Sequence, residues 1–164
     1  MIKDFLGDLF AALASFEGKV MIPHVVNNVG RMGSGFAKAA FTYFPAVREQ
    51  YLAWGHPYIL GDVQFVYMNN KITFANMVGQ SGTISVKNPR PVKYAALVKA
   101  MERVESVCES KDAEPPTQIV CPKFGAGLAG GNWDFIEELI NEIWLARKIP
   151  VSVYYFDDEP VASV

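Results

Sequence analysis

Short runs of Val, Ile and other apolar residues alternate along the chain with stretches in which apolar positions recur every third or fourth residue. The short runs predict strands. Runs that are apolar at consecutive positions, such as residues 20–22 and 119–121, are typical of strands buried on both faces. The predicted strands cover residues 2–6, 20–27, 63–68, 72–77, 118–122 and 151–156.

The helical periodicity predicts an amphipathic surface helix over residues 92–108 and two shorter helices over residues 35–43 and 46–54. Pro45 separates the short helices, because proline can open a helix but cannot continue one. Asn132 is the expected N-cap of a last helix, which carries acidic residues early and Arg147 and Lys148 late. This alternation predicts a three-layer α/β/α fold with a central mixed, largely parallel sheet of about six strands.

Size and charge narrow the class of protein. The 164 residues suffice for one core, and 51% apolar with 20% charged residues is typical of a folded globule. The net charge of −2 and the scattered basic residues argue against general nucleic-acid binding. No apolar run approaches the ~20 residues that span a bilayer, so we expect no membrane association and a cytoplasmic location. Cys108 and Cys121 lack partners at metal-ligand spacing, so we expect buried free thiols, no metal and no cofactor.

A first glycine segment, residues 28–35, joins the predicted strand at 20–27 to the predicted helix at 35–43. A strand, a glycine turn and a helix N-terminus together form an anion site, because unpaired backbone N–H groups face the turn. Glycine also lets a ligand approach the backbone closely. Taken alone, this pattern fits a tight structural turn as well as a ligand loop.

A second glycine segment, residues 124–131, repeats the arrangement after another predicted strand. Loops at the carboxyl ends of parallel strands lie at one edge of the sheet, so the two segments can face each other and hold two phosphates. The pair matches neither the P-loop nor the dinucleotide-binding fingerprint. Those two classes of nucleotide site are therefore not expected.

In their order and spacing, three motifs resemble the macro domain family: GDLF at residues 7–10, HVVNN at 24–28 leading to RMGSGFA at 31–37, and PKFGAGL at 122–128 leading to Trp133. The resemblance covers residues 2–156. It is strongest to the compact branch that includes ADP-ribose-1''-phosphate phosphatases, terminal ADP-ribose-protein hydrolases and small phage-encoded relatives. It implies a macro domain over residues 1–157 and a C-terminal tail over 158–164, in the host cytoplasm if the chain is phage-encoded.

The resemblance also implies an ADP-ribose site. Asp8 would accept a hydrogen bond from the adenine amino group beside the backbone N–H of Leu9, although a carboxylate here also suits a helix cap. Residues 33–37 would wrap the distal ribose and one phosphate, and residues 125–128 would donate backbone N–H groups to the diphosphate. Asn27 would reach the distal ribose, although a buried asparagine at a strand end commonly satisfies local backbone groups. The implied ligand-binding residues are Asp8, Leu9, Asn27, Gly33, Ser34, Gly35, Phe36, Ala37, Gln80, Phe124, Gly125, Ala126, Gly127 and Leu128.

The sequence departs from the ADP-ribose-protein hydrolases of this branch at two positions. The resemblance aligns Gln80 with their catalytic lysine and Ala129 with their catalytic aspartate. An amide cannot form the covalent adduct of a lysine, and alanine has no carboxylate to act as a general base. Lys87 could substitute by flexibility, although a solvated surface lysine is the ordinary interpretation.

His24 is the remaining titratable candidate, with an ordinary pKa near ~6.5 that suits acid or base work at neutral pH. Phosphatase-like members of the branch carry a histidine at the corresponding place, although a lone strand histidine is more often structural. Asn28 could orient a water beside it. His24 and Asn28 are therefore the candidate catalytic residues.

Two functions remain for the expected pocket. A hydrolase of ADP-ribose derivatives, of the ADP-ribose-1''-phosphate phosphatase or ADP-ribosyl ester hydrolase type, is favoured by His24. A non-catalytic module that reads or sequesters ADP-ribose is favoured by Gln80 and Ala129. The expected partners are ADP-ribose or a derivative, with an ADP-ribosylated protein as a further partner. A more remote alternative keeps the fold and gives the cleft to a cyclic dinucleotide or an RNA end.

Overall fold

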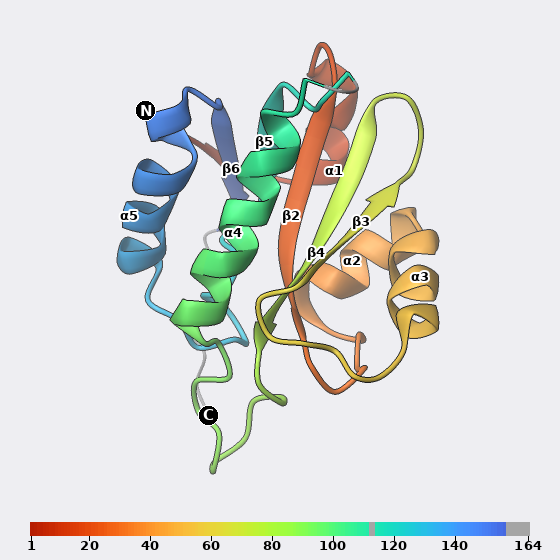
Figure 1. Cartoon of the computed structure of the whole chain (residues 1–164), viewed down its shortest axis with the longest axis vertical. Helices are drawn as coiled ribbons and strands as arrows, with labels where there is room; N and C mark the ends of the chain where they lie inside the picture. The colour runs from red at the N-terminus through yellow and green to blue at the C-terminus, as the bar shows by residue number, and fades with distance from the viewer. Residues whose placement is uncertain (112–113, 157–164) are drawn as a thin grey trace.

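The computed structural model describes residues 1–111 and 114–156. A six-stranded sheet forms its middle layer, in the order β1-β6-β5-β2-β4-β3 (Figure 1). Only β3 runs antiparallel to its neighbour, β4, and all other neighbours are parallel. The predicted mixed, largely parallel sheet is confirmed. The strands are β1 Lys3–Leu6, β2 Val20–Asn27, β3 Val63–Tyr67, β4 Ile72–Gln80, β5 Gln118–Cys121 and β6 Val151–Tyr155.

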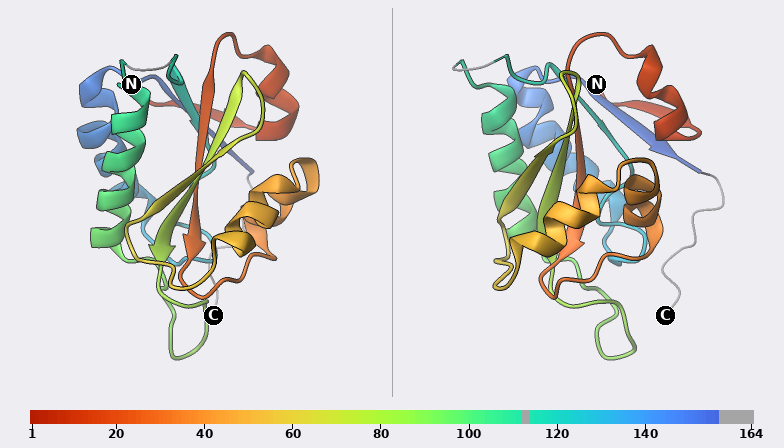
Figure 2. Two further views of the ribbon diagram at one scale, coloured as in Figure 1. Left: turned by 45° about the vertical axis from the view of Figure 1, so that its right-hand side comes forward. Right: turned by 90° about the vertical axis from the view of Figure 1, so that its right-hand side faces the viewer.

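Helices cover both faces of this sheet (Figure 2). The helices α4 (Tyr94–Cys108) and α5 (Trp133–Ile143) pack with one face of the strands into one apolar cluster. The helices α1 (Leu9–Ala12), α2 (Gly35–Tyr43) and α3 (Ala46–Trp54) pack with the other face into a second cluster. Two short 3-10 turns, η1 (Leu13–Ser15) and η2 (Leu145–Arg147), complete the described elements. The three-layer prediction is therefore confirmed.

Strand β2 shows why the central strands read as continuous apolar runs. Met21 packs into the α4–α5 cluster, whereas Ile22 and Val26 pack into the cluster on the opposite face. Because successive side chains of a strand point to opposite faces, a strand covered on both sides must be apolar at nearly every position. His24 and Asn27 interrupt the apolar run, and both are buried.

The longer helices follow from periodicity and capping. Leu97, Met101 and Val104 form the fully buried stripe of α4, and Trp144 donates from Nε1 to the Met101 carbonyl at 2.9 Å. The Asn132 side chain accepts from the backbone N–H of Phe135 at 3.1 Å, so the predicted N-cap of α5 is confirmed.

Some boundaries differ from the prediction. Strand β4 continues to Gln80, three residues beyond its predicted end at residue 77, because it keeps pairing with β2 up to Asn27. Helix α4 begins at Tyr94 rather than at residue 92. Helix α5 ends at Ile143, and Arg147 lies in η2. The single turn of α1 was not predicted, because four residues are too few to display a helical period.

The remaining sequence expectations concern thiols, membrane spans and the tail. Cys121 is a buried free thiol, as expected, whereas Cys108 is free but only half-buried. Burial raises the pKa of Cys108 to about 12. None of the helices within residues 1–111 and 114–156 is long and apolar enough to cross a membrane. The predicted tail at residues 158–164 lies outside the described residues.

Candidate functional site

A cavity of about 860 Å³ opens at the edge of the sheet where the parallel strands end. Its walls come from the segment after β1, the end of β2 with the first glycine segment, the end of β4, the second glycine segment and the end of β6. The predicted site residues that line it are Asp8, Leu9, His24, Asn27, Gly33, Ser34, Gly35, Phe36, Ala37, Gln80, Phe124, Gly125, Gly127 and Leu128. Two predicted site residues, Asn28 and Ala126, are not in its lining.

The Asn27 side chain builds the first glycine segment. Its Oδ1 accepts from the backbone N–H groups of Val29 and Arg31, both at 3.1 Å, and its Nδ2 donates to the Arg31 carbonyl at 2.6 Å. The buried Tyr51 hydroxyl lies 2.7 Å from the Asn27 carbonyl and accepts from the Gly30 N–H at 3.1 Å. The local role of Asn27 is therefore established, and its contact with a ribose stays a prediction that rests on the second Nδ2 hydrogen.

The end of the first glycine segment exposes backbone rather than side chain. Ser34 is the N-cap of α2, but its hydroxyl makes no capping bond. A Cβ at Gly33 would have no atom within 4 Å, and one at Gly35 would meet only the Leu128 side chain, at 3.7 Å. Backbone N–H groups of the first helical turn are therefore accessible to a ligand. Gly35 and Leu128 therefore lie close together, which brings the two glycine segments next to each other at the cavity.

The second glycine segment is held by its own backbone. The Gly131 N–H donates to the Gly125 carbonyl at 2.8 Å, and the Gly130 N–H donates to the Gly127 carbonyl at 3.0 Å. A Cβ at Gly131 would collide with the Gly125 carbonyl, whereas one at Gly127 would have no atom within 4 Å. Gly127 is therefore the open glycine of this turn, and Ala126 is half-buried beside it.

Asp8 lies at another part of the cavity wall, beside Leu9 and Phe10. One carboxylate oxygen accepts from the Phe10 N–H at 2.9 Å and caps α1, so the capping interpretation is confirmed. The second carboxylate oxygen has no hydrogen bond within the described residues, which leaves it available to a donor on a ligand.

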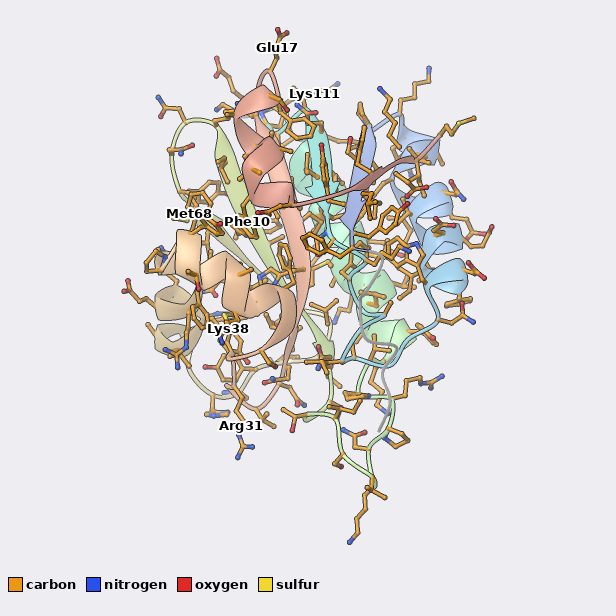
Figure 3. The ribbon with its side chains drawn as sticks, turned by 180° about the vertical axis from the view of Figure 1, so that it is seen from behind. Phe10, Glu17, Arg31, Lys38, Met68 and Lys111 are labelled. Carbon is orange, nitrogen blue, oxygen red and sulfur yellow. The ribbon has the colours of Figure 1, made fainter. Side chains whose placement is uncertain are left out.

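Charge in the cavity lining is more positive than in the chain as a whole. Asp8 is the one acidic lining residue within the described part of the chain, while Arg31 and Lys123 are both cationic. Figure 3 shows Arg31 extending outward from the first glycine segment. Lys123 Nζ lies 4.4 Å from the centroid of the Tyr155 ring, at the end of the neighbouring parallel strand β6. The whole chain carries a net charge of −2, whereas the cavity lining holds two cationic side chains and one acidic one. The lining is therefore locally positive, which favours an anionic ligand.

His24 is buried on the cavity wall and its Nε2 is bonded to Asn76 Oδ1. Asn76 donates from Nδ2 to the Val47 carbonyl at 3.3 Å and to Gln64 Oε1 at 3.1 Å, so its Oδ1 must face the imidazole as an acceptor. The network therefore assigns the proton of the neutral ring to Nε2, and Nδ1 is left as an acceptor. Burial lowers the pKa of His24 to about 4, which corrects the expectation of a pKa near neutrality.

The two positions that separate this chain from the hydrolases of the resembling branch also lie at the cavity. Gln80 is half-buried at the end of β4, and Ala129 is buried in the second glycine segment. Lys87 is exposed and is not in the cavity lining. No group of three or more His, Cys, Asp or Glu side chains that could hold a metal is found among the described residues.

Sequence reasoning missed several lining residues. The aromatic residues among them include Phe10 and Tyr43. Phe10 belongs to α1 and stacks on Phe36 and Tyr43 of α2, with ring centroids 5.4 Å and 4.8 Å apart (Figure 3). Thr83 and Ile84 were also missed, although their place just after the end of a parallel strand was a usable signal. The other lining residues that were not among the predicted site residues are Gly7, Val25, Val26, Arg31, Met32, Ala39, Pro122, Lys123, Ala129, Tyr154 and Phe156.

Comparisons with known proteins agree with this geometry. No family model matches the chain. An uncharacterized 17.5 kDa protein from the tk-vs intergenic region of Enterobacteria phage T4 is 31% identical over 148 residues, which cover 86% of this chain and 88% of the phage protein. A macrodomain protein from Streptomyces coelicolor is 35% identical, with 94% of this chain and 98% of that chain covered and a TM-score of 0.77. This chain therefore belongs to the macrodomain family, as its motifs indicated.

A more distant solved structure, Thermosipho africanus DarTG in complex with ADP-ribose, shares the fold. It is 17% identical, covers 97% of this chain and 43% of its own, and has a TM-score of 0.74. An identity this low shows common architecture alone.

Proposed function

We propose that the cavity binds ADP-ribose. The observation that carries the proposal is that both glycine segments open onto one cavity, with an uncapped helix N-terminus in the first and the open Gly127 in the second. Two phosphate groups need two such sets of backbone donors, and Arg31 and Lys123 add positive charge. The fold neighbour from Thermosipho africanus was solved in complex with ADP-ribose, which supports the same choice of ligand.

In the proposed complex, the adenine, the diphosphate and the distal ribose each contact a different segment of the cavity wall. The free carboxylate oxygen of Asp8 accepts from the adenine amino group, beside the N–H of Leu9. The second glycine segment donates to the diphosphate, and the first glycine segment surrounds the distal ribose. The cavity volume of about 860 Å³ lies within the range of about 300–1,000 Å³ that small-molecule sites occupy.

Calorimetry with ADP-ribose, AMP and ribose 5-phosphate tests the binding proposal. ADP-ribose is expected to bind in the micromolar range and the two fragments far more weakly, because neither fragment fills both glycine segments. An absence of heat with ADP-ribose, or equal affinity for AMP, would refute ADP-ribose as the ligand while leaving the fold unaffected.

Hydrolysis of ADP-ribose derivatives is a second candidate function, and the position of His24 on the cavity wall favours it. With Nε2 held by Asn76, Nδ1 is the ring nitrogen that remains for catalysis. It is unprotonated at neutral pH, so it would accept a proton from an attacking water rather than protonate a leaving group. Backbone N–H groups of the first glycine segment would then stabilise the leaving group.

Three substrates distinguish the hydrolase from a module that only reads ADP-ribose. Wild type and His24→Ala are incubated with ADP-ribose-1''-phosphate, O-acetyl-ADP-ribose and a mono-ADP-ribosylated protein. A hydrolase that uses His24 should lose turnover by about 10²–10⁴-fold in His24→Ala while ADP-ribose affinity changes little. Wild-type protein that binds ADP-ribose but releases product from none of the three substrates would support the reading or sequestering function, which the replacements at Gln80 and Ala129 favour.

Partners and location follow from the same proposal. An ADP-ribosylated protein would place its modification in the cavity, and the cytoplasm is the compartment in which we expect this to occur. The likeness to a phage T4 protein supports the host cytoplasm for a phage-encoded chain.

A further inference from the structure

Residues 81–91 form a loop that connects β4 to α4 and projects beyond the carboxyl edge of the sheet (Figure 2). Two of its residues, Thr83 and Ile84, line the cavity, whereas Val86 and Lys87 at its tip are exposed. The Thr83 hydroxyl has no hydrogen bond within the described residues, so it is available to a ligand. The base of the loop therefore belongs to the cavity wall and the tip does not.

One side of this loop is tied to the first glycine segment by Asn28. The Gly82 N–H donates to Asn28 Oδ1 at 2.9 Å, and the Asn28 N–H donates to the Gln80 carbonyl at 3.0 Å. Asn28 itself is not in the cavity lining. Its side chain therefore acts on the cavity through the residues that follow Gly82, not through contact with a ligand.

Asn88 braces the loop from inside. Its Nδ2 donates to the Ser81 carbonyl at 2.8 Å and to the Thr83 carbonyl at 3.1 Å. The base of the loop is closed by the Ser81 N–H, which donates to the Pro91 carbonyl at 2.9 Å. These bonds fix the backbone on both sides of Gly82, so that the Thr83 side chain has a defined position.

The other side of the loop is tied to the second glycine segment. The Val92 N–H donates to the Ala129 carbonyl at 3.0 Å. The backbones at Gly130 and Pro89 pass so close together that a Cβ at Gly130 would lie 2.5 Å from the Pro89 carbonyl oxygen. The loop therefore spans the gap between the two glycine segments and contacts both.

We propose that Asn28 is a positioning residue, which holds residues 81–91 so that Thr83 and Ile84 form the wall around the part of the ligand beyond the diphosphate. This inference rests on the proposed binding of ADP-ribose. A hydroxyl and an apolar side chain, with no charged group of the loop in the cavity lining, suit an uncharged sugar and not another phosphate. The loop thus gives the cavity its preference for ADP-ribose over ADP, which lacks the distal ribose.

Affinities for ADP-ribose and ADP, measured side by side by calorimetry, test this inference. Asn28→Ala and Asn88→Ala should each weaken ADP-ribose about tenfold, the scale of one hydrogen bond, and change ADP by less than about twofold. Thr83→Val, which keeps the side-chain shape, should weaken ADP-ribose severalfold in the same selective way. Asn70→Ala, in the exposed turn between β3 and β4, and Lys87→Ala, at the loop tip, should leave both affinities unchanged.

A second measurement needs no ligand. Amide exchange at Gly82 should lose protection in Asn28→Ala and regain it in Asn28→Asp, because a carboxylate oxygen can accept the same hydrogen bond. Unchanged Gly82 protection in Asn28→Ala would overturn the positioning role, and so would an equal loss of ADP-ribose and ADP affinity. If wild type does not bind ADP-ribose, the proposed function and the sugar contact are refuted together, while the Gly82 measurement still decides the role of Asn28.

Discussion

The two glycine segments face the same cavity but are built in different ways. The first is shaped by polar side chains, with Asn27 inside the turn and Tyr51 beneath it. The second is shaped by backbone bonds between its own glycines and by close packing at Gly130 and Gly131. The first can therefore be disrupted by removing a distant side chain, whereas the second is disrupted by adding a single methyl group.

The same comparison separates glycines that the fold requires from glycines that leave space for a ligand. Gly33 and Gly127 have open space where a Cβ would lie and do not adopt a positive φ, so the fold does not require glycine there. Gly130 has a φ of +74° and a neighbouring carbonyl in the way, so the fold does require it. Open glycines on a cavity wall are where a ligand approaches the backbone, and substitutions there should separate binding from stability.

The largest effect is expected from Gly127→Glu. The new carboxylate would fill the proposed diphosphate position and repel it, so ADP-ribose affinity should fall by several kcal/mol, on the scale of two or three charge-assisted hydrogen bonds. Thermal unfolding should be almost unchanged, because nothing lies within 4 Å of that Cβ. Calorimetry measures the loss, with Ala14→Glu in η1 as a charge-matched control. Retained affinity in folded Gly127→Glu would show that the second glycine segment does not hold the phosphates.

Acid should destabilise the folded chain through His24, which lies on the strand that leads into the first glycine segment. Burial lowers the pKa of His24 from 6.5 to about 4, so between these pH values the unfolded chain binds a proton that the folded chain does not. The free energy of unfolding should therefore fall as pH drops from about 6.5 toward 4, by up to about 3 kcal/mol. The corresponding strand of the second segment carries Cys121, whose pKa burial raises, so it stays a neutral thiol throughout.

Denaturant titrations of wild type and His24→Leu between pH 4.5 and 7.5 measure this linkage. The difference between the two proteins isolates His24, because the other histidine, His56, is exposed and common to both. A pH dependence that is the same in both proteins would mean that His24 titrates normally in the folded state, and the buried, neutral assignment would then be wrong.

A smaller effect is expected from Gly131→Ala. Its Cβ would collide with the Gly125 carbonyl and press on Val92, so the turn must open, at a cost of about 1–3 kcal/mol in the free energy of unfolding. Gly127→Ala, four residues earlier in the same segment, is the matched control and should unfold like wild type. Equal stability of the two variants in urea would contradict the assignment of Gly131 to the fold.

The elements of this fold were predictable because their signals are local. A consecutive apolar run predicts strand β2, apolar residues three or four positions apart predict helix α4, and Asn132 as an N-cap predicts the start of α5. The glycine segments were predictable for the same reason, since each follows a strand and precedes a helix. Contacts between side chains that lie far apart in the sequence could not be predicted from these local signals.

The site residues show where the local signals end. Asn27 was expected to reach a ribose, yet its partners include Tyr51, 24 residues away in sequence. Asn28 was expected to orient water, yet its partner is Gly82, 54 residues away. The pKa of His24 depends on burial and on Asn76 of a neighbouring strand. Ligand contacts of the residues that line the cavity, Asp8 among them, stay predictions until a complex is measured.

The smallest effect is expected from Tyr51→Phe, and it tests the side-chain construction of the first glycine segment most directly. The substitution keeps the buried ring and removes the hydroxyl that contacts the Asn27 carbonyl and accepts from Gly30. Two backbone groups lose a partner, so the free energy of unfolding should fall by about 1 kcal/mol. Because the segment that loosens also forms the cavity wall, ADP-ribose affinity should fall severalfold. Tyr58→Phe is the matched control: its hydroxyl bonds to the Tyr51 carbonyl at 3.0 Å, on α3 rather than on the segment. It should lose similar stability at unchanged affinity, and equal affinities in the two variants would mean that the first segment keeps its shape without the Tyr51 hydroxyl.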